Sequence, residues 1–75
     1  MQPITVDSSM IHAVGYDPAT EELEVMFTSG KIYRYTHVPH HVYDELLAAD
    51  SKGSYMRACI IGAYPDYRVS GRRRS

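Results

Sequence analysis

Apolar residues alternate with polar ones through the middle of the chain, which predicts β-strands. Over residues 22–27 Leu23, Val25 and Phe27 stand at every second position, the period of a strand with one buried face. An earlier strand is expected over residues 10–17. Between the two strands residues 17–20, Asp-Pro-Ala-Thr, predict a turn, because Asp favours the first turn position and Pro presets the second.

The next turn determines the register of a hairpin. Residues 27–31, Phe-Thr-Ser-Gly-Lys, fit a three-residue loop with Gly30 in the left-handed region. Glu24 then meets Arg34 as an opposite charge on the outer face. A two-residue loop would bring Arg34 among the apolar side chains, because a slip of one residue turns every side chain to the other face. The three-residue loop predicts a core face made of Leu23, Val25, Phe27, Tyr33 and Tyr35.

Helical spacing follows the hairpin. Pro39 is expected at the first helical position of a helix whose apolar stripe is Val42, Tyr43, Leu46 and Leu47.

A second short helix is predicted after Gly53, which we expect to end the first. Ser54 is the expected cap, with Ser51 as the alternative. The predicted apolar stripe of this helix is Tyr55, Met56, Cys59 and Ile60, and Gly62 followed by Pro65 ends it.

These elements predict an α+β fold, a three-stranded antiparallel meander packed on one face by two short C-terminal helices. We expect one domain over residues 8–69, in which residues 64–69 run extended along the sheet. Residues 1–7 are expected to form a flexible N-terminal arm and residues 70–75 a basic disordered tail.

Composition adds limits on the class of protein. A chain of 75 residues has room for one domain, and its single cysteine excludes an intramolecular disulfide. No signal peptide or membrane-spanning stretch is visible, so we expect a cytoplasmic protein with no membrane partner. The formal net charge is −1, but without Arg72, Arg73 and Arg74 the balance is 5 − 9 = −4. An acidic body weighs against a broad nucleic-acid interface.

The order of residues resembles the KTSC domain family from about Ser8 to Val69. The central feature is Tyr33-x-Tyr35, and no single piece is specific without the others. The pieces are Ser8-Ser9, Gly15-Tyr16-Asp17-Pro18, Leu23-x-Val25-x-Phe27, Ser29-Gly30, Val38-Pro39, Val42-Tyr43, Ser51-Lys52-Gly53, Ile60, Gly62 and Tyr64-Pro65.

The resemblance implies a small domain that occurs at the C-terminus of some lysyl-tRNA synthetases and alone in bacteria or phages. It implies no established activity, and its attachment to synthetases suggests RNA binding. Ile61 and Ala63 stand where family members tend to be polar or basic. This departure weighs against phosphate binding by that segment.

Several residues are candidates for chemistry, each with a structural alternative. Tyr33 and Tyr35 could stack bases, but the predicted register places them in the core. His37, His40 and His41 lie close together, with His12 on the first strand, yet Pro39 separates His37 from the helix and no second ligand cluster is present. Cys59 is expected to be a small core residue rather than a nucleophile. We therefore predict no enzyme, no cofactor and no metal site.

Two functions remain open. The first is a non-enzymatic binding domain, an accessory that contacts RNA (tRNA-like) through basic residues. The second is protein interaction or self-association as a homodimer, through strand edges and the outer sheet face with Met26 and Ile32. The nucleic-acid-binding residues predicted for the first function are Arg34, Arg57, Arg68, Arg72, Arg73 and Arg74.

Overall fold

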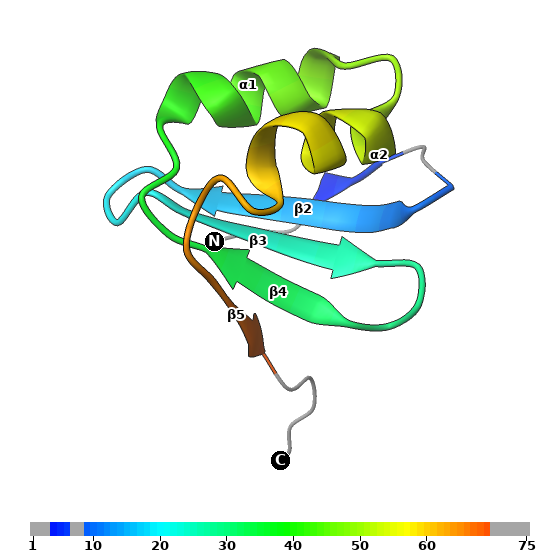
Figure 1. The fold of residues 1–75 in the computed structure, drawn as a ribbon, viewed down its shortest axis with the longest axis horizontal. Helices are drawn as coiled ribbons and strands as arrows, with labels where there is room; N and C mark the ends of the chain where they lie inside the picture. Colours follow the sequence, from blue (N-terminus) through cyan, green and yellow to red (C-terminus); the bar gives the residue numbers. More distant parts are fainter. Residues whose placement is uncertain (1–3, 7–8, 70–75) are drawn as a thin grey trace.

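The computed structural model describes residues 4–6 and 9–69, which form an antiparallel sheet with helices over one face (Figure 1). The strands lie side by side in chain order, β1-β2-β3-β4-β5. Their bounds are β1 Ile4–Thr5, β2 Ile11–Asp17, β3 Glu22–Phe27, β4 Ile32–Tyr35 and β5 Asp66–Val69. The helical segments are α1 His40–Ala48, α2 Lys52–Tyr55 and the π-helical turn η1 Met56–Ile60.

The predicted α+β class is confirmed, and β2, β3 and β4 form the predicted meander. The sheet is wider than predicted, with five strands instead of three. β1 lies within the segment expected to be a flexible arm, and β5 lies within the segment expected to run extended. β1 has two residues, too few to show an alternation, and no hairpin turn that would set a register joins β5 to β4, so the sequence did not reveal their pairing. The predicted tail over 70–75 lies outside the described residues.

The predicted register of β3 and β4 is confirmed. Val25 lies opposite Tyr33, and Glu24 lies opposite Arg34. The Phe27 N–H donates to the Lys31 carbonyl, and the Gly30 N–H donates to the Phe27 carbonyl, both at 2.9 Å. Gly30 has a φ of 96°, so this three-residue loop needs the conformational freedom of glycine.

The turn between β2 and β3 is longer than the predicted four residues. Asp17 accepts the Ala19 N–H through Oδ1 at 3.0 Å and the Glu21 N–H through its carbonyl at 2.8 Å. The turn therefore extends through Glu21, which has a left-handed φ of 59°.

The predicted end of the first helix is wrong. Helix α1 begins at His40, one residue later than expected because Pro39 is its N-cap, and it ends at Ala48. Gly53 lies buried within α2 and does not end a helix. A Cβ at Gly53 would lie 3.1 Å from the Met10 sulfur, so glycine here permits α2 to approach the chain just before β2.

The cap of the second helix is the alternative that the sequence left open. Ser51, and not Ser54, is the N-cap residue of α2. The Ser54 N–H donates to Ser51 Oγ at 3.3 Å, and the two hydroxyls lie 3.0 Å apart.

The predicted burial of Cys59 is wrong, because its side chain is exposed. Met56 and Ile60, in the same predicted stripe, are buried as expected. The Ile61 N–H donates to the Met56 carbonyl at 2.7 Å, an i→i+5 bond of the π type. This turn holds more residues than an α-helical turn, so the third residue after Met56 no longer returns to the core face.

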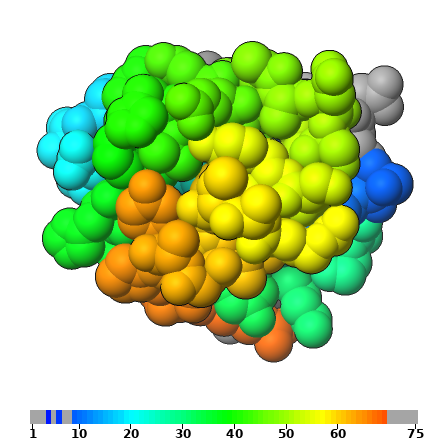
Figure 2. Space-filling view, turned by 45° about the horizontal axis from the view of Figure 1, so that its top comes forward, coloured from blue at the N-terminus to red at the C-terminus, as the bar shows by residue number. Residues whose placement is uncertain are grey.

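The hydrophobic core lies between the helices and the inner face of the sheet. Figure 1 shows the helices over that face, and Figure 2 shows α1 and the α2–η1 segment side by side. Tyr35 is only 2% exposed, and the half-buried Tyr33 ring packs edge-on against Phe27 at 6.0 Å. The prediction that these tyrosines belong to the core is confirmed. The buried core residues are Ile11, Val14, Leu23, Val25, Tyr35, Val38, Val42, Leu46, Met56 and Ile60.

Candidate functional site

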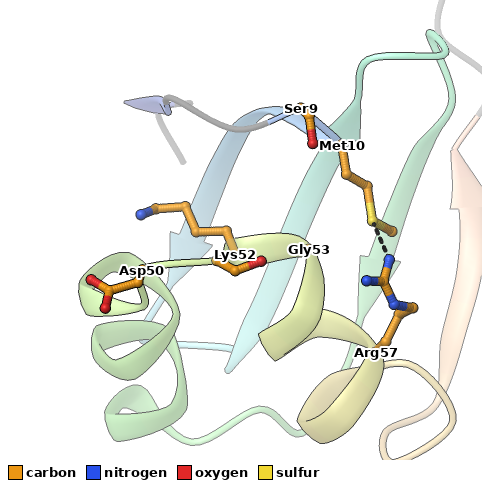
Figure 3. A pocket seen from close by; sticks show the side chains of 7 residues that line it. Ser9, Met10, Asp50, Lys52, Gly53 and Arg57 are labelled. Atoms are coloured by element: carbon orange, nitrogen blue, oxygen red, sulfur yellow. Dashed lines mark hydrogen bonds between the residues drawn. The ribbon is translucent and has the colours of Figure 1, made fainter.

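An open pocket forms where the connection from α1 to α2 meets the chain just before β2 (Figure 3). Its volume is about 270 Å³. In Figure 2 the segment before β2, in blue, lies at the edge of the helical face, next to the yellow helices. The pocket thus joins two parts of the chain that are distant in sequence. Its lining residues are Ser9, Met10, Asp50, Ser51, Lys52, Gly53 and Arg57.

The helix cap and a lysine shape one side of the pocket. Ser51 caps α2, and the Lys52 ammonium donates to the Ala49 carbonyl at 3.0 Å. Ala49 is the C-cap of α1, where a cation is favourable because the last carbonyls of a helix carry partial negative charge. Lys52 is thus held across the junction of the two helices, and its ammonium keeps two further N–H donors.

Arg57 lies at the other side of the pocket. Its Nη1 lies 3.4 Å from the Met10 sulfur, the contact drawn as a dashed line in Figure 3. Thioether sulfur is a weak acceptor, so this contact orients the guanidinium without neutralising it. The Met10 sulfur can lie this close to α2 because Gly53 has no side chain there.

The two cations that line the pocket, Lys52 and Arg57, have no carboxylate partners among the described residues, unlike Arg34 on the other face of the sheet. Among the residues that the structure describes, no carboxylate forms an ion pair with Lys52 or Arg57. Asp50 lines the same pocket but lies beyond ion-pair distance from either cation. The lining therefore includes two cations, which point to opposite sides of the pocket in Figure 3, and the hydroxyl-bearing residues Ser9 and Ser51.

Arg34 lies on the opposite face of the sheet and has a carboxylate partner. Its Nη2 and Nε each lie 2.9 Å from Glu24 Oε1, as the register predicted. Hydrogen bonds to Glu24 and then to Tyr67 raise the pKa of Arg34. A phosphate would have to compete with Glu24 for this guanidinium.

The other predicted arginines lie elsewhere. Arg68 is exposed on β5 opposite Tyr33, so it shares the helix-bearing face with Tyr33 while Arg34 points the other way. Arg72, Arg73 and Arg74 lie outside the described residues. The described arginines of the predicted set therefore occupy three separate places instead of one surface.

Sequence reasoning missed Lys52, Ser9 and Ser51 as site residues. A signal was present, because Ser8-Ser9 and Ser51-Lys52-Gly53 are both pieces of the family resemblance. Only the fold shows that residues from these two pieces line one pocket.

The histidines do not come together. Within residues 4–6 and 9–69 no group of three or more His, Cys, Asp or Glu residues could hold a metal ion. His40 contacts the Asp44 carboxylate at 3.0 Å and packs edge-on against Tyr16 at 5.5 Å. His37 is exposed in the connection before α1, with a left-handed φ of 61°.

Three further tyrosines, Tyr16, Tyr43 and Tyr55, make contacts within the fold and do not form an open surface on which bases could stack. Tyr16 stacks on Tyr43 with ring centroids 4.9 Å apart, and its hydroxyl donates to the Val38 carbonyl at 2.6 Å. Burial raises the pKa of both phenols. At the helix pair, the Tyr55 hydroxyl donates to Glu45 at 2.7 Å. These rings connect α1 to the sheet and to α2.

The family model described as the KTSC domain matches residues 7–64. The chain belongs to the KTSC domain family. A crystal structure of a KTSC domain protein from Yersinia pestis superposes with a TM-score of 0.90 and 32% sequence identity, covering 92% of this chain and 97% of that one. The resemblance expected from the sequence is thus confirmed, together with the α+β architecture.

Similar proteins differ in length. A protein of Tsukamurella paurometabola is 48% identical over 60 residues, covering 80% of this chain and 87% of its own length. A lysine–tRNA ligase of a Nostoc species is 43% identical over 64 residues, covering 85% of this chain but 11% of the ligase. Segments similar to this chain therefore make up most of one protein and a small part of a ligase. No helix in the described part of the chain is long and apolar enough to cross a membrane.

Proposed function

We propose that this KTSC domain is a small, non-enzymatic RNA-binding accessory whose pocket at Lys52 and Arg57 takes phosphate groups of the RNA backbone. The observation that supports the proposal is that one open pocket has a cation on each of two sides, with serine residues in its lining and no carboxylate partner for either cation among the described residues. Lysine is a point-charge donor, and arginine is a fork-shaped donor for phosphate oxygens.

The relatives support RNA as the source of the phosphate. In the Nostoc protein named lysine–tRNA ligase, a segment similar to this chain shares a polypeptide with the ligase. An accessory domain that adds phosphate contacts would suit that position. The similar segment covers only 11% of the ligase, so the similarity carries no ligase activity over to this chain.

The charge balance limits the size of the interface. With two pocket cations engaged, the logarithm of the binding constant should fall against the logarithm of salt concentration with a slope of about −1.4 for single-stranded RNA. An acidic body repels the rest of the backbone. We therefore expect a narrow contact and modest affinity.

The test is equilibrium binding of unmodified tRNA and of a single-stranded RNA oligomer at several salt concentrations. Lys52→Gln and Arg57→Gln should each weaken binding, and the double variant should flatten the salt dependence. Lys31→Gln is the matched control, since it removes one positive charge from an exposed site just before β4 that lies outside the pocket. The proposal fails if the control weakens binding as much as the pocket variants do, or if none of them changes it.

A further inference from the structure

We propose that β5 pairs with β5 of a second copy of this chain, joining two sheets into one continuous antiparallel sheet. This inference concerns the edge of the sheet and does not depend on RNA binding. β5 is the last strand of the sheet, and no strand lies beyond it in the described part of the chain. Unpaired N–H and C=O groups on such an edge favour pairing with another strand.

The hydrogen bonds of β4 and β5 show which groups face the open edge. The Thr36 N–H donates to the Pro65 carbonyl at 2.9 Å, so Pro65 directs its backbone groups toward β4. Successive residues of a strand direct these groups to opposite sides. Tyr67 and Val69 therefore bond toward β4, while Asp66 and Arg68 direct their N–H and C=O groups to the open edge. The N–H that Pro65 lacks would point toward β4, so this proline does not interrupt the edge.

The side chains select one register from three. A two-fold antiparallel pair can place Asp66 opposite the partner's Asp66, Arg68 opposite the partner's Arg68, or Asp66 opposite the partner's Arg68. The first two arrangements place like charges directly opposite, which is destabilising. The third gives an Asp–Arg pair on each side of the axis, with both residues of each pair on the same face.

The same register satisfies the backbone. Asp66 and the partner's Arg68 both direct their backbone groups to the edge, so each pair exchanges both of its hydrogen bonds. Tyr67 then lies at the two-fold axis in a non-hydrogen-bonded position, where facing Cα atoms are about 4.5 Å apart. Tyr67 is 46% exposed in the single chain, which leaves ring surface for its counterpart to cover.

The partner is a second copy of this chain. When two Asp66-Tyr67-Arg68 segments lie antiparallel, the acidic residue of each faces the basic residue of the other. β1, at the other edge, has two residues and offers too little ladder for the same role. A contact built on a four-residue strand buries less than about 1,200 Å², so the dimer should be weak.

Sedimentation equilibrium without RNA, up to millimolar protein, tests the proposal. The wild type should self-associate, and Asp66→Arg or Arg68→Asp alone should weaken association by at least about tenfold, because each puts like charges opposite. An equimolar mixture of these two variants should regain association, because every facing pair again carries opposite charges. Circular dichroism verifies that both exposed-site variants are folded.

Asp44→Arg and Lys31→Asp are the matched controls, since they make the same charge changes at exposed positions outside β5, on α1 and just before β4. Each should associate as the wild type does. A wild type that stays monomeric at every concentration would overturn the proposal. So would edge variants that associate like the wild type, or a mixture that does not regain association.

Discussion

Gly53 shows how one absent side chain positions a site. Sequence reasoning assigned it to the end of a helix, but it lies buried in α2 because a Cβ would lie 3.1 Å from the Met10 sulfur and 3.3 Å from the Met10 Cβ. Met10 in turn contacts Arg57. The glycine therefore determines how closely one wall of the pocket approaches the other.

A larger residue at Gly53 should separate these walls. Gly53→Val should lower the free energy of unfolding by about 1–3 kcal/mol, the usual cost of overpacking. Urea denaturation measures this change, and Met10→Ala in the same chain should recover part of it. Ala58→Val is the control: it adds the same kind of side chain at an exposed site and should change stability by less than about 0.5 kcal/mol. Equal losses in both variants would contradict the packing argument.

Tyr35 gives the domain a specific response to alkaline pH. Burial raises the pKa of its phenol to about 12 from the ordinary 10.0. Since the folded value lies above the unfolded one, the folded state keeps the proton longer. This stabilisation is complete below about pH 10 and is lost as the pH rises from 10 through 12.

Tyr35→Phe should therefore make the decline of stability above pH 10 less steep. One pKa unit corresponds to about 1.4 kcal/mol, so the difference between the two proteins should approach 3 kcal/mol at most. Urea denaturation at pH 8, 10 and 11 measures it. Parallel stability curves for the two proteins would mean that the Tyr35 phenol does not contribute.

At the scale of elements, predictability follows the regularity of the backbone. The β3–β4 register was predictable because only the three-residue loop with Gly30 keeps Arg34 out of the core. The exposure of Cys59 was not predictable, because a π turn changes the angular position of the third residue after Met56. Alternation carries information over several residues, whereas one widened turn leaves no trace in the hydrophobic pattern.

The π turn has a chemical consequence that can be measured. Cys59 should react with a water-soluble thiol reagent in the native protein at a rate close to that of the urea-unfolded chain, because its side chain is exposed. Absorbance at the wavelength of the released thiolate gives both rates. If Cys59 reacts about a hundred or more times more slowly in the native protein than in the unfolded chain, its side chain is buried in the core, as an α-helical stripe would require, and the prediction is wrong.

At the scale of the whole molecule, the pocket depends on contacts between distant parts of the chain. Ser9 and Met10 precede β2, while Lys52 and Arg57 belong to α2 and η1. Local pattern predicts each element but not this contact, which arises only when the helices pack on the sheet. For this reason the sequence identified Arg57 as a candidate but not its neighbour across the pocket, Lys52.

The two faces of the molecule differ in how their cations are used. On the outer face Arg34 pairs with Glu24, and Tyr67, opposite Arg34 on β5, has its hydroxyl 3.5 Å from Glu22. On the helix-bearing side the pocket cations are held by a carbonyl and a sulfur. A phosphate therefore finds less competition at the pocket than on the outer face.

An amide-shift NMR titration with unmodified tRNA, first at low and then at moderate salt, tests the pocket as a phosphate site most directly. We expect shifts concentrated at Ser9, Met10 and residues 50–57 that persist at moderate salt and disappear in the Lys52→Gln/Arg57→Gln variant. Shifts confined to residues 70–75, or centred on Arg34 and the outer face, would contradict this expectation.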